Sequence, residues 1–126
     1  MIEIIADMHT HTVHSHGTGT VEDNVKAAIS AGLQQIVISD HGPQHLFYNI
    51  KDVDAYLKDI DAMRKKYKND IEVLAGVEFN LLSEDGDMDL PPQYADCLLY
   101  TSNRGLRYNM PSAALRAGCL HGQIPV

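Results

Sequence analysis

Residues 2–20, IEIIADMHTHTVHSHGTGT, place a histidine-rich segment directly after a short apolar run. Four of the seven histidines of the chain fall within residues 9–16. The apolar run at 2–6 predicts a buried strand, because short continuous apolar runs are typical of strands that are covered on both faces. Polar side chains that follow such a strand lie at its carboxyl end, where α/β proteins place their chemistry.

The remaining sequence alternates between helix and strand patterns. Thr20 and Asp23 form a capping-box pattern, and apolar residues at helical spacing then predict a helix that ends at Gly32. Apolar residues three, four and seven positions apart predict a second helix over 52–68. Further strands are predicted at 34–39, 71–79 and 96–101, an acidic turn at 83–90 with Asp85-Gly86 at its tip, and a short helix at 111–118.

This alternation predicts an α/β fold with a mostly parallel sheet that is covered on both faces. We expect a single domain over residues 1–126, since no repeat, linker or low-complexity segment divides the chain. A chain of 126 residues is long enough for a hydrophobic core but short for a complete α/β barrel.

Composition excludes several classes of protein. The formal net charge of −7 argues against nonspecific binding to nucleic acid, which requires a basic surface. No apolar stretch approaches the length of a membrane span, and the first residues do not resemble a secretory signal, so we expect a cytoplasmic protein. Cys97 and Cys119 do not form a CxxC pair, and we interpret both as buried apolar residues.

Three predicted strands deliver metal-binding side chains to the same edge of the sheet. His9 and His11 follow the first strand, Asp40 and His41 follow the second, and Glu78 ends the third. Residues i and i+2 of an extended segment point the same way, so His9 and His11 can hold one cation. Imidazole and carboxylate ligands suit Zn²⁺, Mn²⁺ or Fe. Two such cations can activate a water molecule and stabilise the departing oxygen of an ester.

Other polar residues lie close to these candidate ligands in the sequence. His14 and His16 share the i, i+2 spacing on a loop, and the carboxylate of Glu78 can bridge two metals. Asp7 and Asp40 are expected to orient a ring nitrogen from outside the coordination sphere, although Asp7 is also a possible direct ligand. We interpret three other features as solvated loop residues: His45, His121 and the acidic turn at 84–89. The basic run Arg64, Lys65 and Lys66 is typical of a helix carboxyl end.

The stretches DMHTHTVHSHG, ISDHG and AGVEFN resemble the first three motifs of the PHP (polymerase and histidinol phosphatase) metallohydrolases, and the resemblance covers about residues 2–101. It implies a distorted (β/α)₇ TIM-like barrel, of which about four βα units are present here. It also implies up to three divalent metal ions in the family, and we expect one or two in this chain. The implied ligands are His9, His11, His41, the bridging Glu78, and His16 with His14 as the alternative.

The resemblance weakens after the strand at 96–101. The family places a histidine there, and this sequence has Asn103. A later His-Pro motif and an Asp-x-His pair are not found, so we expect an incomplete PHP domain. The candidates for catalytic residues within it are Asp7, Asp40 and Glu78.

The resemblance implies a metal-dependent phosphoesterase that hydrolyses a small phosphomonoester, as a histidinol phosphatase does. The main alternative is a noncatalytic metal-binding or interaction module, and a weaker one is an amidohydrolase-type deaminase or amidase. Four βα units cannot close a barrel, so we expect a homo-oligomer, or a longer parent chain, to cover the open sheet edge.

Overall fold

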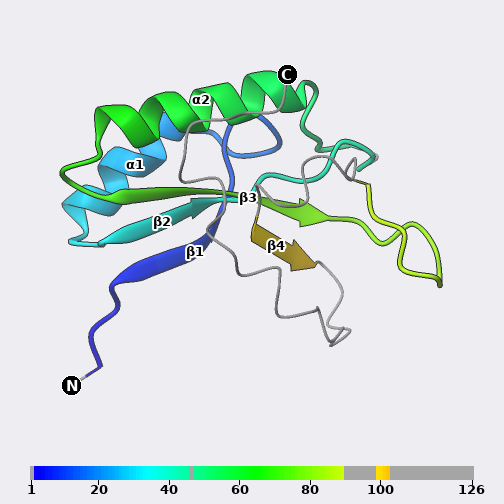
Figure 1. Cartoon of the computed structure of the whole chain (residues 1–126), viewed down its shortest axis with the longest axis horizontal. Helices are drawn as coiled ribbons and strands as arrows, with labels where there is room; N and C mark the ends of the chain where they lie inside the picture. Colours follow the sequence, from blue (N-terminus) through cyan, green and yellow to red (C-terminus); the bar gives the residue numbers. More distant parts are fainter. Residues whose placement is uncertain (1, 46, 90–98, 103–126) are drawn as a thin grey trace.

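The structure is a computed structural model, which describes residues 2–45, 47–89 and 99–102 (Figure 1). Strands and helices alternate along these residues, in the order β1 (Ala6–Thr10), α1 (Val21–Ser30), β2 (Gln35–Ile38), α2 (Val53–Lys66), β3 (Glu72–Phe79) and β4 (Leu99–Ser102). The predicted helix at 111–118, both cysteines, Asn103 and His121 lie outside the described residues.

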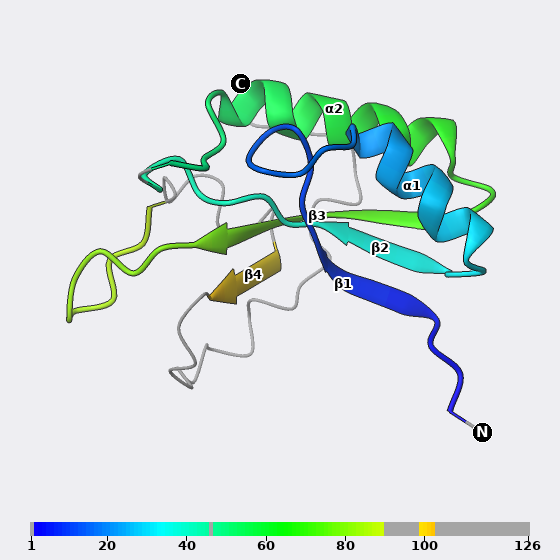
Figure 2. The same cartoon turned by 180° about the vertical axis from the view of Figure 1, so that it is seen from behind.

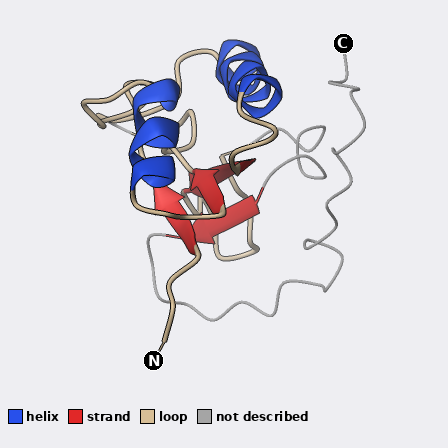
Figure 3. Cartoon of the chain, turned by 90° about the vertical axis from the view of Figure 1, so that its left-hand side faces the viewer, coloured by secondary structure: helices blue, strands red, loops and turns tan. Residues whose placement is uncertain are grey.

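The four strands form one sheet in the order β1-β2-β3-β4, and each neighbouring pair is parallel. Consecutive strands are therefore neighbours, and their carboxyl ends lie at one edge. Both helices lie on the same face of this sheet, as Figures 1 and 2 show from opposite sides and Figure 3 shows end-on. The predicted α/β class and parallel sheet are confirmed, but the described helices cover one face of the sheet rather than both.

The first strand lies further along the chain than predicted. Residues 2–5 are not paired as a strand, and Ile2 and Ile4 are 94% and 75% exposed. The paired segment is the more polar Ala6–Thr10, because Ala6 and Asp7 lie opposite Gln35 and Ile36 of β2. His9 consequently lies inside β1 rather than after it. The register shifts between Asp7 and Thr10, an irregularity of the kind that often re-aims side chains near functional sites.

The two helices begin where the sequence predicts. Thr20 caps α1 through a capping box with Asp23, whose backbone amide donates to the threonine hydroxyl at 3.1 Å. Asp52 caps α2 by accepting from the Ala55 amide at 2.9 Å. The basic residues predicted for a helix end occupy the last turn of α2, where they complement the helix dipole.

The core lies between the helices and the sheet. Its fully or nearly fully buried side chains come mainly from α1, β2, α2 and β3 and include Val25, Ile36, Ile38, Ile60, Val73 and Val77. Tyr56 of α2 is completely buried, and its hydroxyl lies 2.9 Å from the carbonyl oxygens of Ile38 and Gly76. This side chain fixes α2 over the carboxyl half of the sheet.

The segments after β3 agree only partly with the prediction. A turn follows β3, with an antiparallel bridge between Leu81 and Met88 and a left-handed backbone at Gly86 (φ 93°), which glycine adopts without strain. The fourth strand extends one residue beyond the predicted end, to Ser102, and residues 96–98 lie outside the described residues. Among the described helices, none has the length and apolar character needed to cross a membrane.

Candidate metal site

Three neighbouring strands bring the predicted ligands together at the carboxyl edge of the sheet. His9 belongs to β1 and His11 follows it, while His41 lies three residues beyond the end of β2. His41 pairs with Glu78 of β3 through an isolated parallel bridge. The Gly42 amide also donates to the Glu78 carbonyl at 2.9 Å, so the segment after β2 stays beside the end of β3.

One group of donor atoms consists of His9, His11 and Glu78. The Nε2 atoms of the two histidines lie 2.8 Å apart. Oε2 of Glu78 lies 3.2 Å from Nε2 of His9 and 3.0 Å from Nε2 of His11. The glutamate is buried, whereas the His9 side chain is 44% exposed. The two rings therefore point the same way, as their i, i+2 spacing predicts.

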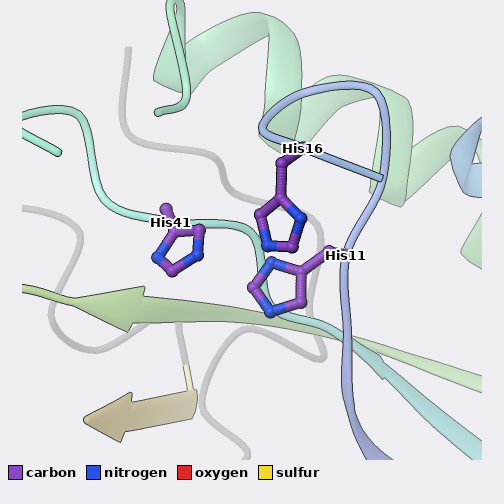
Figure 4. Close-up of side chains that lie close together, drawn as sticks. All are labelled: His11, His16 and His41. Carbon is purple, nitrogen blue, oxygen red and sulfur yellow. The ribbon is translucent and has the colours of Figure 1, made fainter. Parts of the chain in front are cut away.

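A second group consists of His11, His16 and His41, whose rings face one another (Figure 4). The ring centroid of His16 lies 4.4 Å from that of His11 and 5.0 Å from that of His41. In both groups the potential ligand atoms lie within 4.8 Å of one another. His11 belongs to both groups, and Oε2 of Glu78 lies 3.6 Å from Nδ1 of His41.

The donor atoms fit a divalent cation. Two atoms that bind one zinc ion at about 2.0–2.1 Å in tetrahedral geometry lie about 3.4 Å apart. The distances among His9, His11 and Glu78, 2.8–3.2 Å, are close to that separation. Nδ1 of His41 is buried and has no hydrogen-bond partner among the described residues, a costly state that a bound cation would relieve.

The electrostatic environment favours neutral imidazoles. Burial is the main cause that lowers the pKa of His11 below its ordinary value, and the nearby rings of His16 and His41 lower it further. Burial also lowers the pKa of His41, against the opposing charge of Glu78. A neutral imidazole offers a lone pair to a metal, so both shifts favour the form that binds a cation.

The Asp40 carboxylate is hydrogen-bonded to the loop after β1, and among the described residues it makes no hydrogen bond to an imidazole ring. Its carboxylate is fully buried and accepts hydrogen bonds from the amide and hydroxyl of Thr12, both at 2.7 Å, and from the Ser15 hydroxyl. Its own amide donates to the Tyr56 hydroxyl at 3.1 Å. Asp40 thus ties the loop after β1 to the end of β2. The sequence pattern gives no signal for Thr12 or Ser15.

Asp7 and His14 belong to neither donor group. The exposed Asp7 carboxylate accepts a hydrogen bond from the His9 amide at 3.1 Å, so it contributes to the backbone conformation that precedes His11. Nε2 of His14 lies 2.8 Å from the Asp59 carboxylate of α2, and its ring packs edge-on against Tyr56. The i, i+2 pattern at 14 and 16 therefore does not place both rings together.

Two loop residues interpreted as solvated are partly or wholly enclosed. Asp89 is 1% exposed, in contrast to the prediction for the acidic turn, and its carboxylate accepts from the amides of Asn80 and Gln44. His45 is half-buried, with its ring centroid 4.5 Å from that of His41. The sequence gives no signal that Asp89 is buried, because its partners Asn80 and Gln44 lie 9 and 45 residues away along the chain.

The carboxyl ends of the parallel strands bring histidines and a buried glutamate together. The chain is therefore an α/β protein with a candidate divalent-cation site. The chain belongs to the PHP family, since the PHP domain matches residues 7–121. The resemblance noted in the sequence motifs is confirmed.

Curated relatives of the chain are named as probable phosphatases. One from Thermoanaerobacter sp. (strain X514) is 34% identical over 96 residues, covering 71% of this chain and 36% of the relative. A second, from Caldanaerobacter subterraneus subsp. tengcongensis, is 35% identical over 98 residues and is covered over 34% of its length. A third, from Clostridium acetobutylicum, is 33% identical, with 79% of this chain and 39% of the relative covered. The chain therefore spans little more than a third of these relatives.

Proposed function

We propose that this chain is part of a metal-dependent phosphoesterase that hydrolyses a small phosphomonoester, with a substrate class like that of histidinol phosphatase. The chain would form one incomplete PHP domain, and its strands and helices would form part of a distorted (β/α)₇ barrel. The parallel order of consecutive strands, with both connecting helices on one face, supports this arrangement. The names of the curated relatives support the reaction class.

The observation that carries the proposal is the convergence of side chains from three strand ends. His9, His11, His16, His41 and Glu78 would hold one or two divalent ions. Bound Zn²⁺, Mn²⁺ or Fe would supply Lewis acidity toward a phosphoryl group and would lower the pKa of a water molecule. Glu78, shared between His9, His11 and His41, is the residue placed to contact both groups of donors.

The protein itself contributes binding and orientation. The histidines and Glu78 present their donor atoms from one sheet edge, so an anionic phosphoryl group would approach from that edge. Asp40 holds the loop that carries His11 and His16, and we assign it a positioning role. Asp7 acts in the same way on the backbone at His9, through the 3.1 Å contact with the amide.

The test combines metal content with hydrolysis of a phosphomonoester. The 126-residue chain is purified without chelators or a histidine tag, and metals per chain are measured by elemental analysis. Turnover of p-nitrophenyl phosphate is then measured with Zn²⁺, Mn²⁺ or Fe²⁺ added. Glu78→Gln removes the buried carboxylate charge, and Glu72→Gln makes the same change at the exposed amino end of β3 as the matched control.

The proposal expects at least one equivalent of metal and measurable hydrolysis in the wild type and in Glu72→Gln, with both lost in Glu78→Gln. Metal without hydrolysis of any phosphomonoester would favour a noncatalytic metal-binding module. Hydrolysis of amides in preference to phosphate esters would favour an amidohydrolase-type enzyme. Retention of metal and activity in folded Glu78→Gln would overturn the proposed site.

A further inference from the structure

Ser15 stands between a buried carboxylate and one of the clustered histidines. Its hydroxyl oxygen lies 2.5 Å from Oδ1 of Asp40 and 3.4 Å from Nδ1 of His11. The same carboxylate takes two hydrogen bonds from Thr12, so its acceptor positions are directed at the loop after β1. Asp40, Ser15 and His11 therefore form a series of polar contacts that runs from the interior to the candidate metal site.

The direction of each hydrogen bond follows from the number of available hydrogens. A serine hydroxyl carries one hydrogen, and an ionised carboxylate can only accept. The hydroxyl of Ser15 therefore donates to Asp40, and its oxygen remains as an acceptor toward His11. A hydrogen bond at this contact therefore requires the hydrogen of neutral His11 on Nδ1, whereas a hydrogen on Nε2 would be donated to Glu78 at 3.0 Å instead.

This direction determines which nitrogen of His11 is free. A neutral imidazole has one N–H group, so a hydrogen on Nδ1 leaves the lone pair on Nε2. Nε2 is the atom that faces the other donors, 2.8 Å from His9 and 3.0 Å from Glu78. The contact on one side of the ring thus agrees with the requirement for a metal ligand on the other side.

We propose that Ser15 is a positioning residue that holds His11 in the tautomer with hydrogen on Nδ1, so that Nε2 presents its lone pair to a cation. The Ser15 hydroxyl donates its hydrogen to the buried Asp40 carboxylate, and its oxygen then accepts the hydrogen on Nδ1 of His11. This inference rests on the cation site of the proposed function. Loss of such an outer contact typically weakens metal binding by about 10- to 100-fold.

The first experiment determines the tautomer in the metal-free protein. Two-bond ¹⁵N–¹H correlation spectra of the imidazoles, recorded at a pH where His11 is neutral, distinguish hydrogen on Nδ1 from hydrogen on Nε2. The His11 signals are assigned by their loss in His11→Gln. The wild type should carry the hydrogen on Nδ1, Ser15→Ala should lose this bias, and Ser15→Thr, which keeps a hydroxyl, should retain it.

The second experiment measures Zn²⁺ affinity by competition with a chromogenic chelator. Ser15→Ala should bind Zn²⁺ about 10- to 100-fold more weakly than the wild type. Ser15→Thr should stay within about threefold of the wild type, since its hydroxyl preserves the outer contact. Ser83→Ala is the matched control, because the Ser83 hydroxyl also donates to a carboxylate, Asp87, at 2.7 Å, but in the exposed turn after β3.

Each outcome bears on the proposal. Hydrogen on Nε2 of His11 in the wild type would overturn it, as would an unchanged tautomer or unchanged Zn²⁺ affinity in Ser15→Ala. If the wild type binds none of Zn²⁺, Mn²⁺ and Fe²⁺, the proposed function fails, while the spectra of the metal-free protein still decide whether Ser15 sets the tautomer. If Ser15→Ala does not fold, the wild-type and Ser15→Thr spectra give that decision.

Discussion

At the scale of single residues, the loop after β1 separates two histidines that have equivalent spacing in the sequence. His16 lies against His11 and His41, whereas His14 contacts Asp59 and Tyr56 of α2. Alternation of side chains holds for extended backbone, but this loop turns through hydrogen bonds from the amides of Ser15 and Gly17 to the Thr12 carbonyl. Sequence spacing alone therefore left the choice between His14 and His16 open.

Replacing His16 should weaken metal binding much more than replacing His14. Loss of a direct ligand should exceed the effect of losing an outer contact, so we expect His16→Ala to bind Zn²⁺ more than about 100-fold more weakly. His14→Ala should change affinity by less than about tenfold, because it removes a contact that only fastens the loop to α2. Chelator competition on folded variants measures both, and a stronger effect of His14→Ala would reverse the assignment.

We expect the buried carboxylate of Asp89 to stabilise the fold. Its buried carboxylate accepts from the Asn80 amide at 2.8 Å, the Asn80 side chain at 2.8 Å and the Gln44 amide at 3.2 Å. Asp89→Ala leaves these donors without their acceptor, and we expect the free energy of unfolding to fall by roughly 3 kcal/mol. Urea denaturation measures this change.

The matched control for Asp89 lies in the same turn. Asp87 is exposed, and its carboxylate contacts Ser83 rather than buried amides. Asp87→Ala should change the free energy of unfolding by less than about 0.5 kcal/mol, as is usual for surface positions. Equal effects of the two substitutions would show that burial of Asp89 does not contribute to stability.

At the scale of elements, the sequence predicts those strands and helices whose burial is visible as a regular pattern. The two helices and β2 and β3 agree with prediction because their apolar spacing reflects a single core. The predicted position of β1 is wrong because Ile2, Ile4 and Ile5 suggest burial, whereas the segment that pairs with β2 is the more polar Ala6–Thr10. Strand pairing is a nonlocal property that an apolar run does not encode.

The same distinction applies to the candidate site. The convergence of His9, His11, His41 and Glu78 follows from the rule that parallel strands end at one edge, so it could be predicted before their distances were known. The supporting contacts could not be predicted in this way. Asp40 and Ser15 are 25 residues apart in the chain, and their contact depends on the path of a loop that has no periodic pattern.

Contact between the two helices has a predictable pH dependence. The half-buried Glu22 of α1 accepts hydrogen bonds from Lys66 and Tyr67, both at 2.6 Å. The hydrogen bond from Lys66 is the main cause that lowers the pKa of Glu22 to about 2, and that from Tyr67 adds to it. Because the folded pKa lies below the unfolded value, this contribution to stability is present above pH 4.5 and is lost as the pH falls toward 2.

Glu22→Gln should therefore be less stable than the wild type at pH 7, and the difference should shrink between pH 4.5 and 2. Solvent and salt screen an exposed contact, so we expect a small effect that decreases further in high salt. Urea denaturation at pH 7, 4 and 2.5 measures the difference. Glu84→Gln, in the exposed turn, serves as the control, and a pH-independent difference for Glu22→Gln would contradict the assignment.

At the scale of the whole molecule, β1 is an edge strand of the described sheet. The strand pairs with β2 along one edge only among the described residues, and Ile2, Ile4 and Met8 are 94%, 75% and 51% exposed. An unpaired strand edge next to exposed apolar side chains is a common site of association between chains.

We therefore predict that the 126-residue chain associates with a second copy of itself through β1. Native mass spectrometry and light scattering across a range of concentrations should detect a dimer, and the double substitution Ile4→Lys and Met8→Lys should raise its dissociation constant more than about tenfold by placing charges at the edge. Phe47→Lys is the control, since Phe47 is 78% exposed but lies on the loop after β2. A wild-type chain that stays monomeric at every concentration would refute this arrangement, and a dimer unaffected by the lysines would place the contact on another surface.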